Sequence, residues 1–221
     1  MLRVEEGSGR VVLEADAGED VRAVALDATR RILWTFSPGT LRSFGGDGEE
    51  LAAVPVTVPM GRALLAVDPV DGSVALAAGR GLWRFDAAGT PLGATALDGR
   101  LRGLAFDARQ HRLWVATTSS LQAFNAGMQP ASRLAMSREA PLAGLAVAAE
   151  TGMVWTVGGG HLWKLGPDGR LLMDLKMPEL ATVAGDGRGG AWAASSRDLF
   201  HLSAAGRVTA HLQPFAGAGA I

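Results

Sequence analysis

The stretch VRAVALDATRRILWTF at residues 21–36, followed by LRSFGGDG at 41–48, contains the unit that decides the fold. An apolar segment ending near an acid precedes a second apolar segment that usually contains Trp, then a Leu-x-x-(Phe/Leu) group and a turn ending in Gly. Four further segments repeat this order. They read RALLAVDPVDGSVALAA with LWRFDAAG (62–78, 82–89), LRGLAFDARQHRLWVAT with LQAFNAG (101–117, 121–127), LAGLAVAAETGMVWTVG with LWKLGPDG (142–158, 162–169), and LATVAGDGRGGAWAAS with LFHLSAAG (180–195, 199–206).

The spacing of the repeat predicts the architecture. The leading leucines of the third element are separated by 41, 39, 41 and 37 residues; they are Leu41, Leu82, Leu121, Leu162 and Leu199. Each unit holds four short apolar runs bounded by Gly, Pro, Asp or Ser, which is typical of strands and too short for helices. Four strands in roughly forty residues are typical of one blade of a β-propeller.

The two termini contribute further pieces of the repeat. GRVVLEA at 9–15 matches GRLLMDL at 169–175, Leu2 precedes Leu41 by 39 residues, and FAGAGAI at 215–221 resembles PLAGLAV at 141–147. We therefore predict an all-β, six-bladed β-propeller in which one blade is shared between the termini, because such sharing removes exposed sheet edges. A five-bladed ring is the alternative, and it would leave three strands surplus.

The predicted domain is single and spans 1–221. Its incomplete blade consists of 1–15 and 213–221, and the five complete blades span about 21–56, 61–97, 101–136, 141–176 and 180–212. A chain of this length fits one domain, and its 30 glycines and 10 prolines suit many short strands and tight turns.

The bulk charge and composition exclude several classes of function. With 21 basic and 22 acidic residues the net charge is −1, so nucleic acid is not an expected partner. Cysteine is absent, which removes disulfides, thiolate nucleophiles and cysteine metal sites but leaves the compartment undetermined. The first residues show no signal peptide and no run is long enough to span a membrane, so we expect a soluble, monomeric domain of this chain or of a longer protein.

Recurring aromatic and acidic residues each admit a structural and a functional interpretation. We expect Trp34, Trp114, Trp155 and Trp192 on the second strands, and Trp83, Trp163 and Phe200 on the third, to fill the space between blades. Stacking on a sugar or base is the alternative. Asp27, Asp68, Asp107 and Asp186 follow the first strands, where a carboxylate bonds turn amides; metal ligation is the alternative.

The repeat resembles NHL-type propellers and the related virginiamycin-lyase and gluconolactonase propellers. LWRFDAAG at 82–89 is the most similar stretch, whereas Ala148 replaces the acid of the fourth unit and Gly127 comes one residue early. The resemblance covers nearly the whole chain and implies the architecture. It leaves the function open, because one fold hosts many functions.

The enzymatic alternative is a metal-dependent lactonase or lyase acting at the central channel. A gluconolactonase-like site needs several oxygen ligands converging on one cation, and the single asparagine, Asn125, lies in an outer turn. The lyase resemblance implies a catalytic histidine with magnesium, for which His161 is the candidate position. We assign no catalytic residue, no metal ligand and no cofactor.

A binding or scaffolding module is therefore the predicted function. Loops between second and third strands emerge at the same end as loops between blades, and they carry arginines, hydroxyls and backbone amides. Such groups suit a protein, a peptide or a small anionic ligand. The candidate ligand-binding residues are Arg80, Arg100, Arg138, Ser119, His161 and Arg197.

Overall fold

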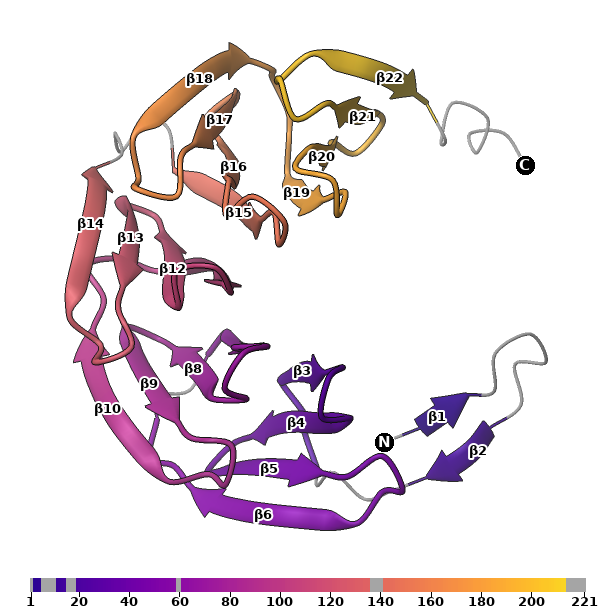
Figure 1. The fold of residues 1–221 in the computed structure, drawn as a ribbon, viewed down its shortest axis with the longest axis vertical. Coiled ribbons are helices and arrows are strands. Elements are labelled where there is room, and N and C mark those ends of the chain that lie inside the picture. Colours follow the sequence, from indigo (N-terminus) through magenta and orange to yellow (C-terminus); the bar gives the residue numbers. More distant parts are fainter. Residues whose placement is uncertain (1, 5–10, 15–18, 59–60, 136–140, 214–221) are drawn as a thin grey trace. The chain divides into compact units, whose positions relative to one another are not determined.

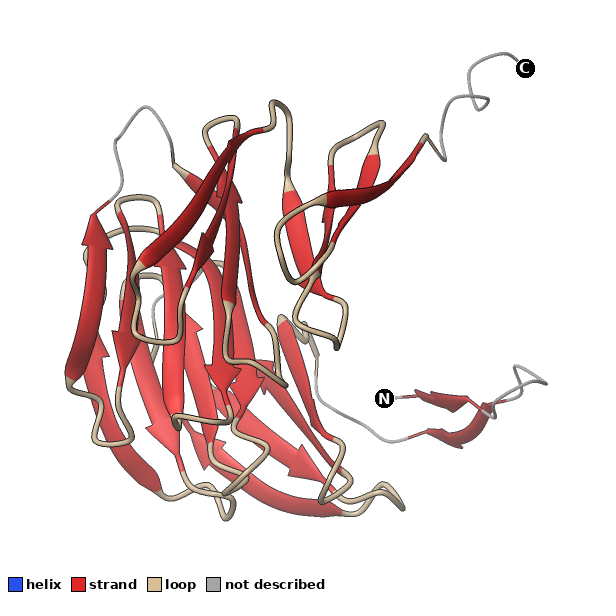
Figure 2. Cartoon of the chain, turned by 45° about the horizontal axis from the view of Figure 1, so that its top comes forward, coloured by secondary structure: helices blue, strands red, loops and turns tan. Residues whose placement is uncertain are grey.

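The computed structural model describes residues 2–4, 11–14, 19–58, 61–135 and 141–213. All regular structure in these residues is β-strand, as Figure 2 shows. Within them there is accordingly no helix long and apolar enough to cross a membrane. The chain divides into two compact units, Met1–Ala96 and Leu97–Ile221, which we call the first and second units and describe separately.

The first unit contains two four-stranded sheets, which we call blades 1 and 2, and one two-stranded sheet (Figure 1). All neighbouring strands are antiparallel. Blade 1 consists of β3 (Ala23–Asp27), β4 (Ile32–Ser37), β5 (Thr40–Phe44) and β6 (Glu50–Pro55); blade 2 of β7 (Ala63–Val67), β8 (Val74–Ala78), β9 (Gly81–Phe85) and β10 (Pro91–Ala96); and the small sheet of β1 (Leu2–Val4) and β2 (Val11–Glu14).

The second unit contains blades 3, 4 and 5, again with strands in chain order (Figure 1). Blade 3 consists of β11 (Leu101–Asp107), β12 (Arg112–Thr117), β13 (Ser120–Phe124) and β14 (Pro130–Ala135). Blade 4 consists of β15 (Leu142–Val147), β16 (Val154–Gly158), β17 (His161–Leu165) and β18 (Leu171–Lys176). Blade 5 consists of β19 (Thr182–Gly185), β20 (Ala191–Ala194), β21 (Leu199–Leu202) and β22 (Val208–Leu212). The prediction of five antiparallel four-stranded sheets is confirmed.

Strand register confirms that the tryptophans of the second strands are equivalent. Each pairs with an alanine of the first strand, as Ala25↔Trp34, Ala105↔Trp114, Ala146↔Trp155 and Ala184↔Trp192. A small residue on the first strand leaves room beside the indole ring. The sequence repeat therefore corresponds to a repeat of the same cross-strand residue pair in these four blades.

These tryptophans pack against the following blade. Trp34, Trp114 and Trp155 are at most 1% exposed. Trp34 shares an apolar cluster with Val74 of blade 2, and Trp155 shares one with Val183 of blade 5. The core-packing interpretation is confirmed for these three rings, whereas Trp192 of blade 5 is only partly buried.

Aromatic residues of the third strands face the preceding blade. Trp163 of blade 4 belongs to a cluster with Trp114 of blade 3, and Phe200 of blade 5 packs against the cluster that contains Trp155. Within each unit, then, the space between two blades is filled by a second-strand ring from one side and a third-strand ring from the other.

The two-stranded sheet has the register of the third and fourth strands of a blade. Its pairs Leu2↔Glu14, Arg3↔Leu13 and Val4↔Val11 include a bulge after Arg3, as blade 4 has one after Lys164. The predicted match of GRVVLEA with GRLLMDL therefore holds for Val11–Glu14. The predicted equivalence of Leu2 with Leu41 is wrong by one residue, because the bulge aligns Val4 with Phe44 and hence Leu2 with Arg42.

The first strands of blades 3 and 4 approach each other so closely that a side chain is excluded at Gly103. A Cβ atom added there would lie 2.6 Å from the Cβ of Leu145 and 3.3 Å from its backbone nitrogen. Because the clash involves the neighbouring strand and not the end of a flexible side chain, the strands have to move apart to relieve it.

We expect Gly103→Ala to lower the free energy of unfolding by about 1–3 kcal/mol, the usual cost of overpacking. Urea denaturation measures this change. Gly127→Ala is the matched control, because its added Cβ would lie 3.6 Å from the Asn125 side chain, an ordinary contact. Equal stability of the two variants would contradict the close approach of β11 and β15.

Candidate functional site

The acids after the first strands bind turn amides. The Oδ1 atoms of Asp27, Asp68, Asp107 and Asp186 accept N–H groups of Arg30 (2.9 Å), Val70 (3.0 Å), Arg109 (3.0 Å) and Arg188 (2.7 Å), respectively. The turn interpretation of these residues is confirmed. In blade 4, where Ala148 stands instead, backbone bonds from Thr151 and Gly152 to the Ala148 carbonyl close the turn.

In three of these turns the second carboxylate oxygen meets a cationic or histidine side chain. Oδ2 accepts from Arg30 in blade 1 at 3.0 Å, from Arg84 in blade 2 at 3.5 Å, and meets His201 in blade 5 at 2.9 Å. The guanidinium of Arg30 also donates to the Pro69 and Val70 carbonyls of blade 2. The recurring acids therefore hold turns, and Asp27 also holds Arg30, which joins blade 1 to blade 2.

Arg84 is the most deeply buried cation of the described side chains. It is 1% exposed, donates to Asp68 and Asp71, and bonds Ser73 Oγ at 2.7 Å. Asp68 is 0% exposed and Asp71 nearly half exposed. Since water cannot compensate the Asp68 carboxylate, the arginine provides its countercharge.

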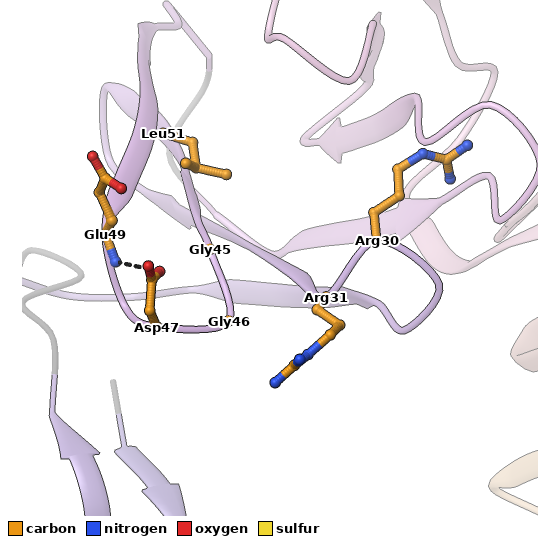
Figure 3. A pocket seen from close by; sticks show the side chains of 7 residues that line it. All are labelled: Arg30, Arg31, Gly45, Gly46, Asp47, Glu49 and Leu51. Carbon is orange, nitrogen blue, oxygen red and sulfur yellow. Dashed lines mark hydrogen bonds between the residues drawn. The ribbon is translucent and has the colours of Figure 1, made fainter.

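A shallow pocket of about 480 Å³ lies at the turns of blade 1. It is lined by Arg30, Arg31, Gly45, Gly46, Asp47, Glu49 and Leu51 (Figure 3). Figure 3 shows the side chains of Arg30 and Arg31 pointing in different directions, and Arg30 is already bound to Asp27 and two carbonyls. The two arginines thus do not converge on one ligand position.

Loops at one end of the second unit form the candidate site, which we call the end surface. In each antiparallel blade the loop between the second and third strands emerges at the same end as the segment that enters the first strand. Blades 3, 4 and 5 pack in succession, so these loops adjoin. The described part of the end surface consists of residues 97–100, 117–120, 158–161, 177–180 and 195–198.

The Asp98 carboxylate is the most heavily hydrogen-bonded group of the end surface. Ser120 Oγ donates to Oδ1 at 2.9 Å or to Oδ2 at 2.8 Å, and Thr117 Oγ1 and Ser119 Oγ donate to Oδ1 at 2.9 and 3.2 Å. Gln122 Nε2 donates at 2.7 Å and Arg133 Nη2 at 2.6 Å.

These contacts determine the ionisation of Asp98. Partial burial of the carboxylate raises its pKa, but hydrogen bonds from Ser120 and Thr117 and the charge of Arg133 outweigh burial and hold the pKa below its ordinary value. Asp98 is therefore an anion at neutral pH, with its charge balanced inside the protein.

Blades 4 and 5 each carry a histidine–aspartate pair that includes the same fourth-strand position of the repeat. His161 Nδ1 lies 2.6 Å from Asp174 Oδ1, and His211 Nε2 lies 2.7 Å from Asp198 Oδ1. Hydrogen bonds from His211 and Gln213 hold the pKa of Asp198 below its ordinary value. The fourth-strand residues Arg133, Asp174 and His211 are equivalent, because they pair with Gln122, Trp163 and Phe200.

The histidines are also packed against aromatic rings. His161 stacks on Trp163 with ring centroids 5.4 Å apart, and His211 stacks on Phe200 at 4.4 Å. His161 thus has an aspartate on one ring nitrogen and an indole on its face, a structural arrangement that accounts for its position without catalysis.

Four of the predicted ligand-binding residues lie on the end surface: Arg100, Ser119, His161 and Arg197. Ser119 and His161 are bound to Asp98 and Asp174, while Arg100 and Arg197 are exposed. Arg80 is exposed in the β8–β9 loop of the first unit. Arg138 lies outside the described residues. Their binding role stays a prediction.

Sequence reasoning missed Asp98, Gln122 and Arg133. A signal was present, because Gln122 occupies the third-strand position that is aromatic at Trp83, Trp163 and Phe200. A polar residue at a position that is aromatic in the other blades indicates that it binds a polar partner. Strand register alone does not identify that partner.

We expect Arg84→Met to destabilise the protein by about 3–5 kcal/mol, because it leaves the buried Asp68 carboxylate without its countercharge. The free energy of unfolding measures the loss, and adding Asp68→Asn should recover part of it. Arg109→Met, which removes an exposed guanidinium bound to the Glu150 carbonyl, is the control and should cost less. An equal loss in both single variants would contradict this account.

Asp98 should contribute pH-dependent stability. Since its pKa is lowered in the folded state, the contribution is complete well above the ordinary aspartate pKa of ~3.9 and is lost as the pH falls through the folded-state pKa. The stability difference between the protein and Asp98→Asn should therefore shrink from pH 7 towards pH 3. A difference that is constant over this range would refute the assignment.

Comparison with known proteins supports the architecture. No family model matches the chain, and no curated protein matches it. Among solved structures, one described as a crystal structure of a nidogen/laminin complex matches with a TM-score of 0.63 and 14% identity, over 96% of this chain and 89% of that chain. At this identity the likeness shows the fold alone, and with the five antiparallel four-stranded sheets it indicates a β-propeller.

Proposed function

We propose that this chain is a non-enzymatic binding module that presents the end surface of its second unit to an acidic protein or peptide. The observation that carries this proposal is that the aspartates of that surface are bound within the protein. Asp98, Asp174 and Asp198 are each paired with a basic side chain of the same unit.

The exposed arginines of the same loops have no such pairing. Among the residues that the structure describes, neither Arg100 nor Arg197 has a carboxylate partner. Their backbone N–H groups bond the Thr118 and Ser195 hydroxyls, and the Arg100 carbonyl accepts the Thr118 N–H. Glu179 is an exposed acid of this surface. Guanidinium groups bind carboxylates in bidentate geometry, so an acidic partner suits the surface.

The class of partner follows from the exposure of these groups. They lie on loops, where binding residues of a rigid scaffold commonly occur. The structurally similar chain belongs to a protein complex, which supports a protein partner at the level of the fold.

Six blades within one domain are part of the proposal, and so is the NHL-type resemblance. The β1–β2 sheet supplies the outer strands of a sixth blade, and 215–221, outside the described residues, matches a first strand. Val24 and Leu26 of blade 1 are 60% and 63% exposed, and Trp192 of blade 5 is less buried than its equivalents. A further blade would cover such faces, whereas a five-bladed ring would not use β1 and β2.

We expect the double variant Arg100→Ser, Arg197→Ser to weaken binding of a fluorescent hexaglutamate peptide at least about tenfold. A charge-assisted hydrogen bond contributes about 1.5–3 kcal/mol, and an exposed one contributes less, so the loss of two such contacts accounts for this change. Arg170→Ser with Arg207→Ser is the matched control. It removes two exposed arginines from the β17–β18 and β21–β22 turns, at the opposite end of the blades. Fluorescence anisotropy measures affinity and thermal unfolding confirms folding.

Equal affinities of the two double variants would refute the role of the end surface. Stoichiometric divalent metal in the purified protein, with a melting temperature that falls on chelation, would instead favour the lactonase or lyase alternative.

A further inference from the structure

Blade 3 contains a set of donors that converges on one carboxylate. The donors are the side chains of Thr117, Ser119, Ser120, Gln122 and Arg133, all from β12, β13, β14 or the β12–β13 loop. The carboxylate, Asp98, comes from the loop before β11 and not from these strands. The donors and the carboxylate that they bind thus belong to separate segments of the chain.

The donors are oriented by bonds that do not involve Asp98. Ser120 Oγ accepts a hydrogen bond from Gln122 Nε2 at 2.9 Å, and Thr117 Oγ1 accepts from the Ser120 N–H at 3.0 Å. Their hydroxyl protons are therefore available to the carboxylate. Thr117 and Ser120 are 0% exposed and Gln122 is 8% exposed, so burial fixes the geometry of these three donors, whereas the Arg133 side chain is 59% exposed.

The folded protein would be less stable if these donors had no acceptor. Buried hydroxyls and an amide without an acceptor lose the hydrogen bonds that water would otherwise supply. The Arg133 guanidinium adds a positive charge that favours an anion over water. The set consequently selects a carboxylate.

The Asp98 loop lies against the β12–β13 loop, where the backbone N–H and carbonyl of Arg100 bond Thr118. A Cβ atom added at Gly99 would lie 2.5 Å from Ser119 Oγ and 2.9 Å from Thr118 Oγ1. The Asp98 side chain is 25% exposed, so it lies at the boundary between the donor set and solvent. Lifting the loop would open the donor set to the end surface.

We propose that the donor set of blade 3 is a carboxylate-binding site whose resident ligand is Asp98, and that a carboxylate of an acidic peptide replaces Asp98 when the 97–100 loop lifts. This inference rests on the proposed function for the class of partner. A tethered ligand competes at a high effective concentration, so the apparent peptide affinity is reduced by the fraction of molecules with the loop closed.

The test replaces the internal ligand with acetate. In Asp98→Ala, about 200 mM sodium acetate at pH 7 should raise the melting temperature by at least about 2 °C over the same concentration of sodium chloride, because a ligand that binds only the folded state stabilises it. Asp86→Ala is the control, since Asp86 accepts backbone N–H groups of Ala88 and Thr90 in its own turn. An equal acetate effect in both variants overturns the proposal.

Asp98→Asn keeps the size of the side chain but removes the charge that Arg133 binds, and it provides the test if Asp98→Ala does not fold. Hexaglutamate should bind Asp98→Asn or Asp98→Ala about tenfold more tightly than the unaltered protein, because the internal ligand is weakened or absent. Unchanged or weaker peptide binding overturns displacement by a peptide.

The two proposals fail separately. Loss of the arginine effect with a retained acetate effect would reject the end-surface function and leave the carboxylate site standing. Retained arginine dependence without a specific acetate effect would reject the site and leave the function.

Discussion

The packing of successive blades is the constraint on which the rest of the structure depends. A four-stranded sheet has two apolar faces and can bury neither by itself, so each blade uses its neighbours. Trp34 and Trp155 reach the following blade, while Trp163 and Phe200 face the preceding one. Gly103 shows how close this packing is, because even a methyl group there would meet Leu145.

The polar side chains gather at the two ends of the blades and make different contacts at each end. At the turns between first and second strands, acids such as Asp27 and Asp107 accept turn amides. At the opposite end, each blade of the second unit has a pair of a basic side chain and an aspartate, in which one partner comes from a loop or the third strand and the other from the fourth strand. The residue types differ among Asp98–Arg133, His161–Asp174 and Asp198–His211, so the position is shared and the chemistry is not.

This internal pairing has a functional consequence for the end surface. The aspartates of this surface are bound to basic side chains of the protein, and its exposed charged side chains include Arg100, Arg197 and Glu179. The site around Asp98 is a further case of such internal pairing, because its buried hydroxyl and amide donors and the Arg133 guanidinium require an anion. In the folded protein that anion is supplied by the chain itself.

The sequence by itself determined the repeat, the five antiparallel sheets, the tryptophan positions and the turn acids, because each follows from short-range periodicity and local hydrogen bonding. Only the tertiary structure decided that Ser119 and His161 are bound to aspartates and that Gln122 and Arg133 surround Asp98. Asp98 and Arg133 are thirty-five residues apart, and their contact depends on strand register and on the course of a loop. Those are set by packing across the whole blade, which no local pattern encodes.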